Sequence, residues 1–306
     1  MAVHGDGVAA TTGWLRRLQV FLEMIKFEHT LFALPFALIS MLLAARHAGF
    51  PRNLPAFGTI AWILAAMVGA RSAAMAFNRL VDASYDARNP RTAARALPAG
   101  LLTSTQVWGF TLAAILLFLT AAYMLNPLCF ALAPVALVLI LGYSYTKRFT
   151  ALSHLALGLG IGAAPVGAWI AVTGTLQGVP VLLGCAVMLW IAGFDIIYAL
   201  QDESFDRSAG LHSLPQRLGA SRALMVSRLL HLGMVALLVW LGAAAGLGVV
   251  YFLGVAGVAM LIAYEHSLVS PGDLSRVNMA FFTLNGWISI GLFCFVAADL
   301  FWLGGK

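Results

Sequence analysis

The apolar stretches of this chain constrain its fold more than any other feature of the sequence. Each is long enough for a membrane-spanning helix, which needs about 20 residues to cross the hydrocarbon core of a bilayer. Nine such stretches begin near Thr30, Phe57, Ser104, Pro127, His154, Pro180, Ala223, Leu247 and Met279. We therefore expect an all-α integral membrane protein with nine transmembrane helices.

The composition supports the same conclusion. Hydrophobic residues make up 61% of the 306 residues and charged residues only 10%, whereas a soluble domain carries about 25% charged residues. One globular core of this size could not bury that apolar excess, so a lipid bilayer is the solvent that suits the chain. The sequence contains no linker and no low-complexity segment, which predicts a single domain over residues 1–306.

The basic residues indicate the orientation in the membrane. With nine spans, 14 of the 18 lysines and arginines fall in gaps on one side: Arg16, Arg17, Lys26, Arg79, Arg88, Arg91, Arg95, Lys147, Arg148, Arg207, Arg217, Arg222, Arg228 and Arg276. Cytoplasmic loops carry such an excess, so we expect a cytoplasmic N-terminus, including segment 1–25. The net charge of +6 does not indicate nucleic-acid binding, because the basic residues form no stripe with interleaved aromatic residues.

Two acidic clusters stand out in a chain with only 12 acidic residues. The first is Asn78, Asp82 and Asp86, and the second is Asp195, Tyr198, Asp202 and Asp206. Spacings of three and four residues place each set on one face of a helix. Both clusters follow spans that end on the same predicted side of the membrane.

Such acidic faces favour a bound cation. Like charges four residues apart destabilise a helix, and charge near the membrane interior is costly. Mg²⁺ is typically held by one or two carboxylates together with phosphate oxygens, so two opposed faces could clamp one diphosphate between two Mg²⁺ ions. The alternative is a pair of solvated helix ends whose aspartates bond to nearby arginines.

The two clusters also carry a family resemblance. The run N-x-x-x-D-x-x-x-D from Asn78 and the run D-x-x-Y-A-x-x-D-x-x-x-D from Asp195 resemble the two signature motifs of the UbiA family of intramembrane prenyltransferases. The surrounding segments, residues 89–92, 95–100 and 210–215, are similar as well. Within the family, the chain most resembles the 4-hydroxybenzoate polyprenyltransferase branch.

The resemblance implies Mg²⁺-dependent transfer of a polyprenyl group from a polyprenyl diphosphate to an aromatic acid. It also implies helices around a central cavity that opens to the cytoplasm and to lipid, in a bacterial inner membrane. Asp82, Asp202 and Tyr198 would be catalytic. The implied metal ligands are Asn78, Asp82, Asp86, Asp202 and Asp206, with Asp195 deeper in the cavity. Tyr198 would bond to an aspartate or face the developing cation.

Three basic residues are further candidates for substrate binding. Arg71 lies seven residues before Asn78, about two turns deeper along the same helix, and an intramembrane arginine requires a partner. Its planar guanidinium suits the carboxylate of a benzoate acceptor, although a structural pair with Asp195 or snorkelling to the interface would also satisfy it. Lys147 and Arg148 either contact the diphosphate or serve as positive-inside anchors.

Several alternatives remain open at this stage. The preferred candidate for the acceptor is 4-hydroxybenzoate, in ubiquinone synthesis. The alternative acceptor is a dihydroxynaphthoate, in menaquinone synthesis. A secondary transporter would place its polar groups near the membrane midplane on broken helices, whereas these carboxylates lie at helix ends. A phosphatidyltransferase of the CDP-alcohol type also uses aspartates with Mg²⁺, but neither cluster shows its glycine directly after an aspartate.

Overall fold

The computed structural model describes residue 13, residues 20–24 and residues 30–303. These residues form helices and connecting loops and no β-strand. Most of the predicted cytoplasmic segment 1–25, together with Arg16, Arg17 and Lys26, lies outside the described residues. The cytoplasmic position of the N-terminus therefore stays a prediction.

The long helices begin where the apolar stretches begin, to within three residues, when the π-helix that leads into the last one is counted with it. They are α2 (Thr30–His47), α3 (Phe57–Asp86), α4 (Ser104–Leu125), α5 (Pro127–Thr146), α6 (Ser153–Thr173), α7 (Gly178–Ala199), α10 (Ala220–Ala244), α11 (Val249–Ser267) and α12 (Asn285–Ala298). A π-helix, Met279–Leu284, leads directly into α12. Hydropathy over about 20 residues therefore located each helix correctly.

The helices make this chain a multi-pass integral membrane protein. Among the described residues, eight helices are long and apolar enough to cross a membrane, and α2 contributes a shorter apolar stretch, Ala33–His47. Leu116, Val138 and Leu232 leave more than half of their side chains exposed on the outer faces of α4, α5 and α10. Lipid is the solvent that accommodates such faces. The count of nine spans is not settled by these helices.

Local sequence signals explain several helix ends. Thr103 and Gln106 form a reciprocal capping box at the start of α4, which satisfies two backbone N–H groups of the first turn. Asn126 alone separates α4 from α5, and its Oδ1 accepts a hydrogen bond from the backbone N–H of Cys129 at 2.9 Å. Gly174 ends α6 in the left-handed region, at φ 68°. Helices α4 and α5 therefore form a tight hairpin.

Glycines bring α6 and α7 into backbone contact. A methyl group added to Gly158 would lie 2.3 Å from the carbonyl oxygen of Met188, and one added to Gly162 would lie 2.5 Å from that of Gly184. Small residues allow this close approach between membrane helices. The tight pair supports a core in which Trp169 and Trp190 are almost completely buried. Because α7 carries Asp195 and Tyr198 of the second acidic cluster, this packing also holds that part of the cluster in place.

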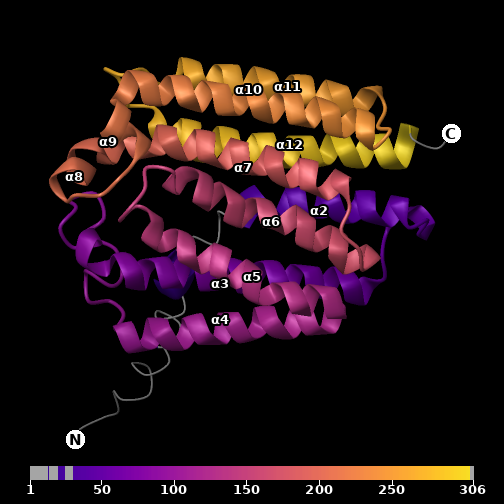
Figure 1. Cartoon of the computed structure of the whole chain (residues 1–306), viewed down its shortest axis with the longest axis horizontal. Helices are drawn as coiled ribbons and strands as arrows, with labels where there is room; N and C mark the ends of the chain where they lie inside the picture. The colour runs from indigo at the N-terminus through magenta and orange to yellow at the C-terminus, as the bar shows by residue number, and fades with distance from the viewer. Residues whose placement is uncertain (1–12, 14–19, 25–29, 304–306) are drawn as a thin grey trace, which may run out of the picture.

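The C-terminal ends of α3, α5 and α7 meet at one end of the bundle (Figure 1). Two short helices, α8 (Glu203–Ser208) and α9 (Leu214–Leu218), lie at that end. The two long connections, residues 87–103 and 200–219, therefore fold over the same end of the molecule. All predicted site residues except Arg71 lie in this region or in the last turns of helices that lead to it.

Candidate active site

A polar cavity of about 310 Å³ opens at this end of the bundle. All ten residues that the sequence singled out line it: Arg71, Asn78, Asp82, Asp86, Lys147, Arg148, Asp195, Tyr198, Asp202 and Asp206. The two acidic clusters, more than 100 residues apart in the chain, therefore face one another across a single space. What the sequence could only place on one side of the membrane, the fold brings together.

The first cluster lies within the last turns of α3, on the side that lines the cavity, as its spacing predicts. The Asn78 amide donates a hydrogen bond to Asp82 Oδ2 at 2.8 Å. Asp86 is buried and accepts two hydrogen bonds from Arg95 Nη1, at 2.7 and 2.9 Å. A buried carboxylate needs such charged partners, so the loop after α3 neutralises the cluster that ends the helix.

The second cluster does not lie on one continuous α-helix, and that part of the prediction was wrong. Helix α7 ends at Ala199, a 3₁₀ turn spans Leu200–Asp202, and α8 begins at Glu203. Asp195, Tyr198, Asp202 and Asp206 still line the same cavity. The 3₁₀ turn winds more tightly than an α-helix, so it changes the register without turning the carboxylates away.

Lys147 and Arg148, at the end of α5, reach one aspartate from each cluster. Lys147 Nζ lies 3.6 Å from Asp206 Oδ2, and Arg148 Nη2 lies 3.7 Å from Asp82 Oδ1. Arg148 also donates to the carbonyl oxygen of Val81 at 2.7 Å. These two residues are thus placed between the clusters, inside the cavity, and are not merely anchors at a loop.

The loop after α3 crosses the cavity to the second cluster. Arg91 forms a two-pronged pair with Asp202, at 2.9 Å and 2.5 Å, and donates to the Tyr198 hydroxyl at 3.1 Å. The Asn89 amide donates to Asp202 Oδ1 at 3.0 Å. Burial lowers the pKa of Arg91, but the hydrogen bond and negative charge of Asp202 outweigh it, so its pKa lies above the ordinary value. The sequence did not identify Asn89 as a site residue.

Asp195 is paired with a buried histidine in the first turn of α6. Its Oδ2 lies 2.6 Å from Nδ1 of His154, and the backbone N–H of Leu214 donates to Nε2 of the same ring at 3.3 Å. His154 is completely buried. The bond to Leu214 ties this histidine to the start of α9. Its contact with Asp195 carries no sequence signal, because the two residues are 41 positions apart.

Arg71 is the deepest basic group of the polar cavity. Asp195, the structural partner considered from the sequence, pairs with His154 instead. Nε of Arg71 is buried and bonds to none of the residues that the structure describes. Met75, Tyr143 and Ile161 line the cavity around it. An arginine held here retains hydrogen-bonding capacity for a ligand that enters the cavity.

The charges of the cavity suit an anionic ligand. Among the described residues its lining includes five aspartates and six lysines or arginines. Each aspartate lies beside a basic side chain, and over residues 13, 20–24 and 30–303 no three acidic, histidine or cysteine groups meet closely enough to hold a metal by themselves. Mg²⁺ needs only one or two carboxylates when phosphate oxygens complete its shell. The oxygen-only ligands, including a buried Asp206 Oδ2 that accepts no hydrogen bond from the described residues, fit an ion that arrives with a diphosphate.

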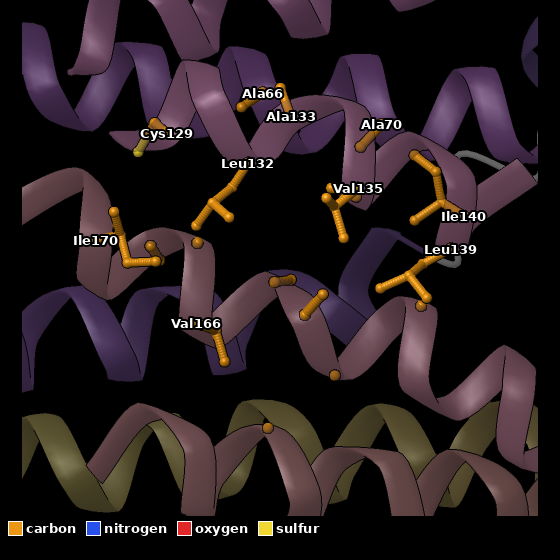
Figure 2. Close-up of a pocket in the computed structure, with 18 of the residues that line it drawn as sticks. Ala66, Ala70, Cys129, Leu132, Ala133, Val135, Leu139, Ile140, Val166 and Ile170 are labelled. Carbon is orange, nitrogen blue, oxygen red and sulfur yellow. The ribbon is translucent and has the colours of Figure 1, made fainter. Parts of the chain in front are cut away.

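A second, apolar cavity of about 380 Å³ lies between α3, α4, α5, α6 and α7. Figure 2 shows Leu132, Val135 and Leu139 of α5 projecting from one side and Ile170 of α6 on the other. Its walls contain many small residues, including Ala66 and Ala70 of α3. On α3 these wall residues continue along the same helix face into those of the polar cavity, since Met67 lines the apolar cavity and Arg71, four residues later, lines the polar one.

Comparisons with known proteins agree with this geometry. A model of the UbiA prenyltransferase family matches residues 33–288. The chain is 30% identical over 247 residues to a protein of Methylococcus capsulatus named 4-hydroxybenzoate octaprenyltransferase, covering 81% of this chain and 84% of that one. A protein of the same name from Tolumonas auensis is 30% identical over 241 residues, covering 79% and 84%.

Solved structures are similar over nearly the whole chain. The apo structure of a UbiA homologue from Aeropyrum pernix K1 superposes with a TM-score of 0.80 at 34% identity, covering 89% of this chain and 98% of that one. A UbiA homologue from Archaeoglobus fulgidus bound to GPP and Mg²⁺ superposes with a TM-score of 0.72 at 21% identity, covering 92% and 99%. The second likeness concerns the fold alone.

Proposed function

This chain belongs to the UbiA prenyltransferase family, and we propose that it transfers a polyprenyl group from a polyprenyl diphosphate to 4-hydroxybenzoate, as a step of ubiquinone synthesis. One observation carries the proposal: two aspartate clusters from distant parts of the chain, with basic side chains between them, line one cavity. That cavity adjoins a second, apolar one. The donor has the same two parts, a charged head and a hydrocarbon tail.

The head of the donor belongs between the two clusters. Lys147 and Arg148 lie between Asp206 and Asp82, where they can pair with phosphate oxygens as charge-assisted hydrogen-bond donors. Asn78, Asp82 and Asp86 on one side, and Asp202 and Asp206 on the other, would hold Mg²⁺. When bound, the ion supplies Lewis-acid stabilisation of the departing diphosphate. The aspartates that bind the ion would then lose their present ion pairs with the arginines.

The tail of the donor fits the apolar cavity. Its walls are formed mainly by alanine, glycine, leucine and isoleucine residues, so a hydrocarbon chain can pass from the surrounding lipid into the cavity without exposing apolar surface to water. Because the cavities share the faces of α3, α5, α6 and α7, a chain anchored by its diphosphate can extend along them. Its allylic carbon then lies where the two cavities meet.

The acceptor carboxylate would bind Arg71. Its guanidinium is a planar, two-pronged donor, lies beyond the aspartates, and has a buried Nε with no partner among the described residues. A ring held there would present its carbon to the allylic end of the donor. Positioning of this kind supplies a large part of the rate in a two-substrate reaction.

The chain's own residues then account for the remaining steps. The C1–O bond of the donor breaks, and its electron pair leaves with the diphosphate, whose charge Lys147, Arg148 and Arg91 stabilise. The aromatic ring attacks the allylic cation, and its ring proton passes to a carboxylate or to the released diphosphate. Tyr198, which Arg91 contacts, would face the cation. No covalent bond to the enzyme is needed.

A dihydroxynaphthoate, for menaquinone, is the second candidate acceptor, because its carboxylate would bind Arg71 equally well. The relatives named 4-hydroxybenzoate octaprenyltransferase favour the benzoate. We also propose that the polar cavity opens to the cytoplasm, which the charge bias of the loops supports, and that the membrane is a bacterial inner membrane, which the bacterial relatives support.

The test is an acceptor panel. Membranes containing the chain are supplied with a polyprenyl diphosphate, Mg²⁺ and either 4-hydroxybenzoate or a dihydroxynaphthoate, and products are identified by mass. We expect prenylated 4-hydroxybenzoate, and no product when EDTA exceeds the metal. Prenylation of the naphthoate alone would overturn the choice of acceptor. Full turnover in EDTA would overturn the role of the metal.

A further inference from the structure

One wall of the polar cavity is formed by a π-helix, at the point where the last spanning helix begins. Residues Met279–Leu284 adopt this wider turn, and α12 continues from Asn285. Phe281 and Phe282 of the turn line the cavity. Isolated π turns are rare and are frequent at functional sites, so the turn calls for a physical explanation.

Buried polar contacts hold the turn open. The Asn285 amide donates to the carbonyl oxygens of Ala280 and Phe281, both at 3.1 Å. Its Oδ1 accepts from Trp190 Nε1 of α7 at 2.8 Å, and its Nδ2 lies 3.4 Å from Oε1 of Glu265 on α11. Asn285, Trp190 and Glu265 are all completely buried. Three helices therefore converge on one asparagine, whose side chain bonds to carbonyl groups inside the turn.

The phenylalanine rings of the π-helix pack against aromatic residues of α7, including Tyr198 of the second acidic cluster. The Phe281 ring centre lies 4.2 Å from that of Tyr198 and 5.0 Å from that of Phe194. Phe282 packs 4.7 Å from Phe281 and 6.1 Å from Tyr198. Tyr198 is bonded to Arg91, which pairs with Asp202. The four rings thus stand directly beside the charged groups of the cavity.

We propose that Phe194, Tyr198, Phe281 and Phe282 form an aromatic wall against the allylic carbon of the donor, with Asn285 as the positioning residue of that wall. The proposal rests on the proposed prenyl transfer. Once the C1–O bond breaks, the cation faces two nucleophiles. The aromatic acceptor gives the prenylated acid and a proton, whereas water gives a prenyl alcohol, diphosphate and a proton.

The wall acts on this competition in two ways. Aromatic faces attract a cation within about 6 Å of the ring centre. Apolar rings also exclude water from a site whose other walls are charged. Without the rings, the cavity would surround the electrophilic carbon with hydrated aspartates and arginines. The turn therefore decides which nucleophile reaches the carbon.

The partition between the two products tests the proposal. The purified full-length chain receives a radiolabelled prenyl diphosphate, Mg²⁺ and 4-hydroxybenzoate, and the ratio of prenyl alcohol to prenylated acid is measured. We expect Phe281→Leu to raise this ratio roughly tenfold, since a desolvated ring–cation contact is lost. Phe281→Tyr keeps a ring and should stay near the original ratio. Asn285→Asp, which removes the amide donors, should raise the ratio as Phe281→Leu does.

The controls separate this role from folding and from the proposed function. Trp287→Leu alters an exposed ring of α12 and should leave the ratio unchanged. The ratio does not depend on how much protein folds, so a merely structural Asn285 would lower yield without moving it. Unchanged ratios in Phe281→Leu and in Phe281→Leu with Phe282→Leu would overturn the wall. Failure of the unaltered chain to prenylate any aromatic acid would overturn the proposed function instead.

Discussion

The aspartates of the cavity lie beside basic side chains, and these pairs explain how so many charges persist within a membrane protein. Asp86 is held by Arg95, Asp202 by Arg91 and Asp206 by Lys147. Removing one member of a buried pair leaves an uncompensated charge, which destabilises more than the pair stabilises. The same basic groups can turn to a diphosphate when it enters. The aspartate charges of such a site are balanced by basic side chains without the ligand, and the basic side chains are balanced by the diphosphate when it is bound.

The first prediction at this scale concerns the proposed metal ligands. Asp82→Asn and Asp202→Asn keep the shape of the side chain but remove one charge from each cluster. We expect either change to lower kcat by about 10²–10³, the usual effect of losing one electrostatic contact to a transition state. Steady-state prenyl transfer measures it. Asp273→Asn, at an exposed loop position, is the control, and near-normal rates in both cavity variants would falsify the two-cluster site.

The second residue-scale prediction concerns Arg71. Arg71→Lys keeps the charge but loses the two-pronged geometry, so the KM for the acceptor should rise roughly tenfold while the donor KM stays nearly constant. A rise in KM alone reports lost ground-state binding. Arg46→Lys is the matched control, because Arg46 contacts backbone carbonyls at Ala245 and Gly246. Equal weakening of both substrates by Arg71→Lys would assign this arginine to the diphosphate.

At the scale of elements, two local departures from the regular α-helix shape the cavity. The 3₁₀ turn Leu200–Asp202 follows α7, and the π-helix Met279–Leu284 precedes α12. The tighter turn keeps Asp202 and Asp206 on the cavity side, and the wider turn brings Phe281 and Phe282 to it. Both depend on α7 being held firmly, which the glycine contact with α6 provides.

That contact gives the element-scale prediction. Gly162→Ala places a methyl group against the carbonyl oxygen of Gly184 and should destabilise the fold by about 1–3 kcal/mol, the usual effect of overpacking. Gly167→Ala is the matched control on the same helix, since a methyl group there meets nothing within 4 Å, and alanine is the better helix former. Thermal unfolding in detergent measures both. Equal unfolding midpoints for the two variants would argue against the tight α6–α7 contact.

At the scale of the whole molecule, the charged groups of the polar cavity lie at one end of the bundle, and the apolar cavity lies along the membrane-spanning part of the helices. The loop residues 87–103, the end of α5 and helix α8 surround the polar cavity. Water and the charged donor head therefore need only reach one face of the membrane. In the proposed reaction the hydrocarbon tail of the donor would stay within the thickness of the bilayer, where burying it in protein exposes no apolar surface to water.

The orientation is testable by labelling. Ala93→Cys lies at an exposed position of the loop after α3, and Thr175→Cys at an exposed position between α6 and α7, at opposite ends of the bundle. With Cys129, Cys185 and Cys294 replaced by alanine, we expect a membrane-impermeant thiol reagent on intact cells to label Thr175→Cys alone. Breaking the cells should expose Ala93→Cys. Labelling of Ala93→Cys in intact cells would reverse the predicted orientation.

Local physics allowed the sequence by itself to determine the helices and the first acidic face. Hydropathy over a span and the 3.6-residue repeat depend on neighbouring residues only, so helix starts and the set Asn78, Asp82 and Asp86 followed directly. The nine-span count goes beyond the eight long spans found among the described residues.

Only the tertiary structure decided which charges meet. Arg88, Arg91 and Arg95 are locally equivalent, yet Arg91 pairs with Asp202 and Arg95 with Asp86. His154 pairs with Asp195 across two helices, and the π turn depends on Asn285 reaching Trp190 and the turn's carbonyl groups. The contacts of Arg91, His154 and Trp190 join residues far apart in the chain, and the free energies of all these contacts depend on burial, which arises only once the helices have packed.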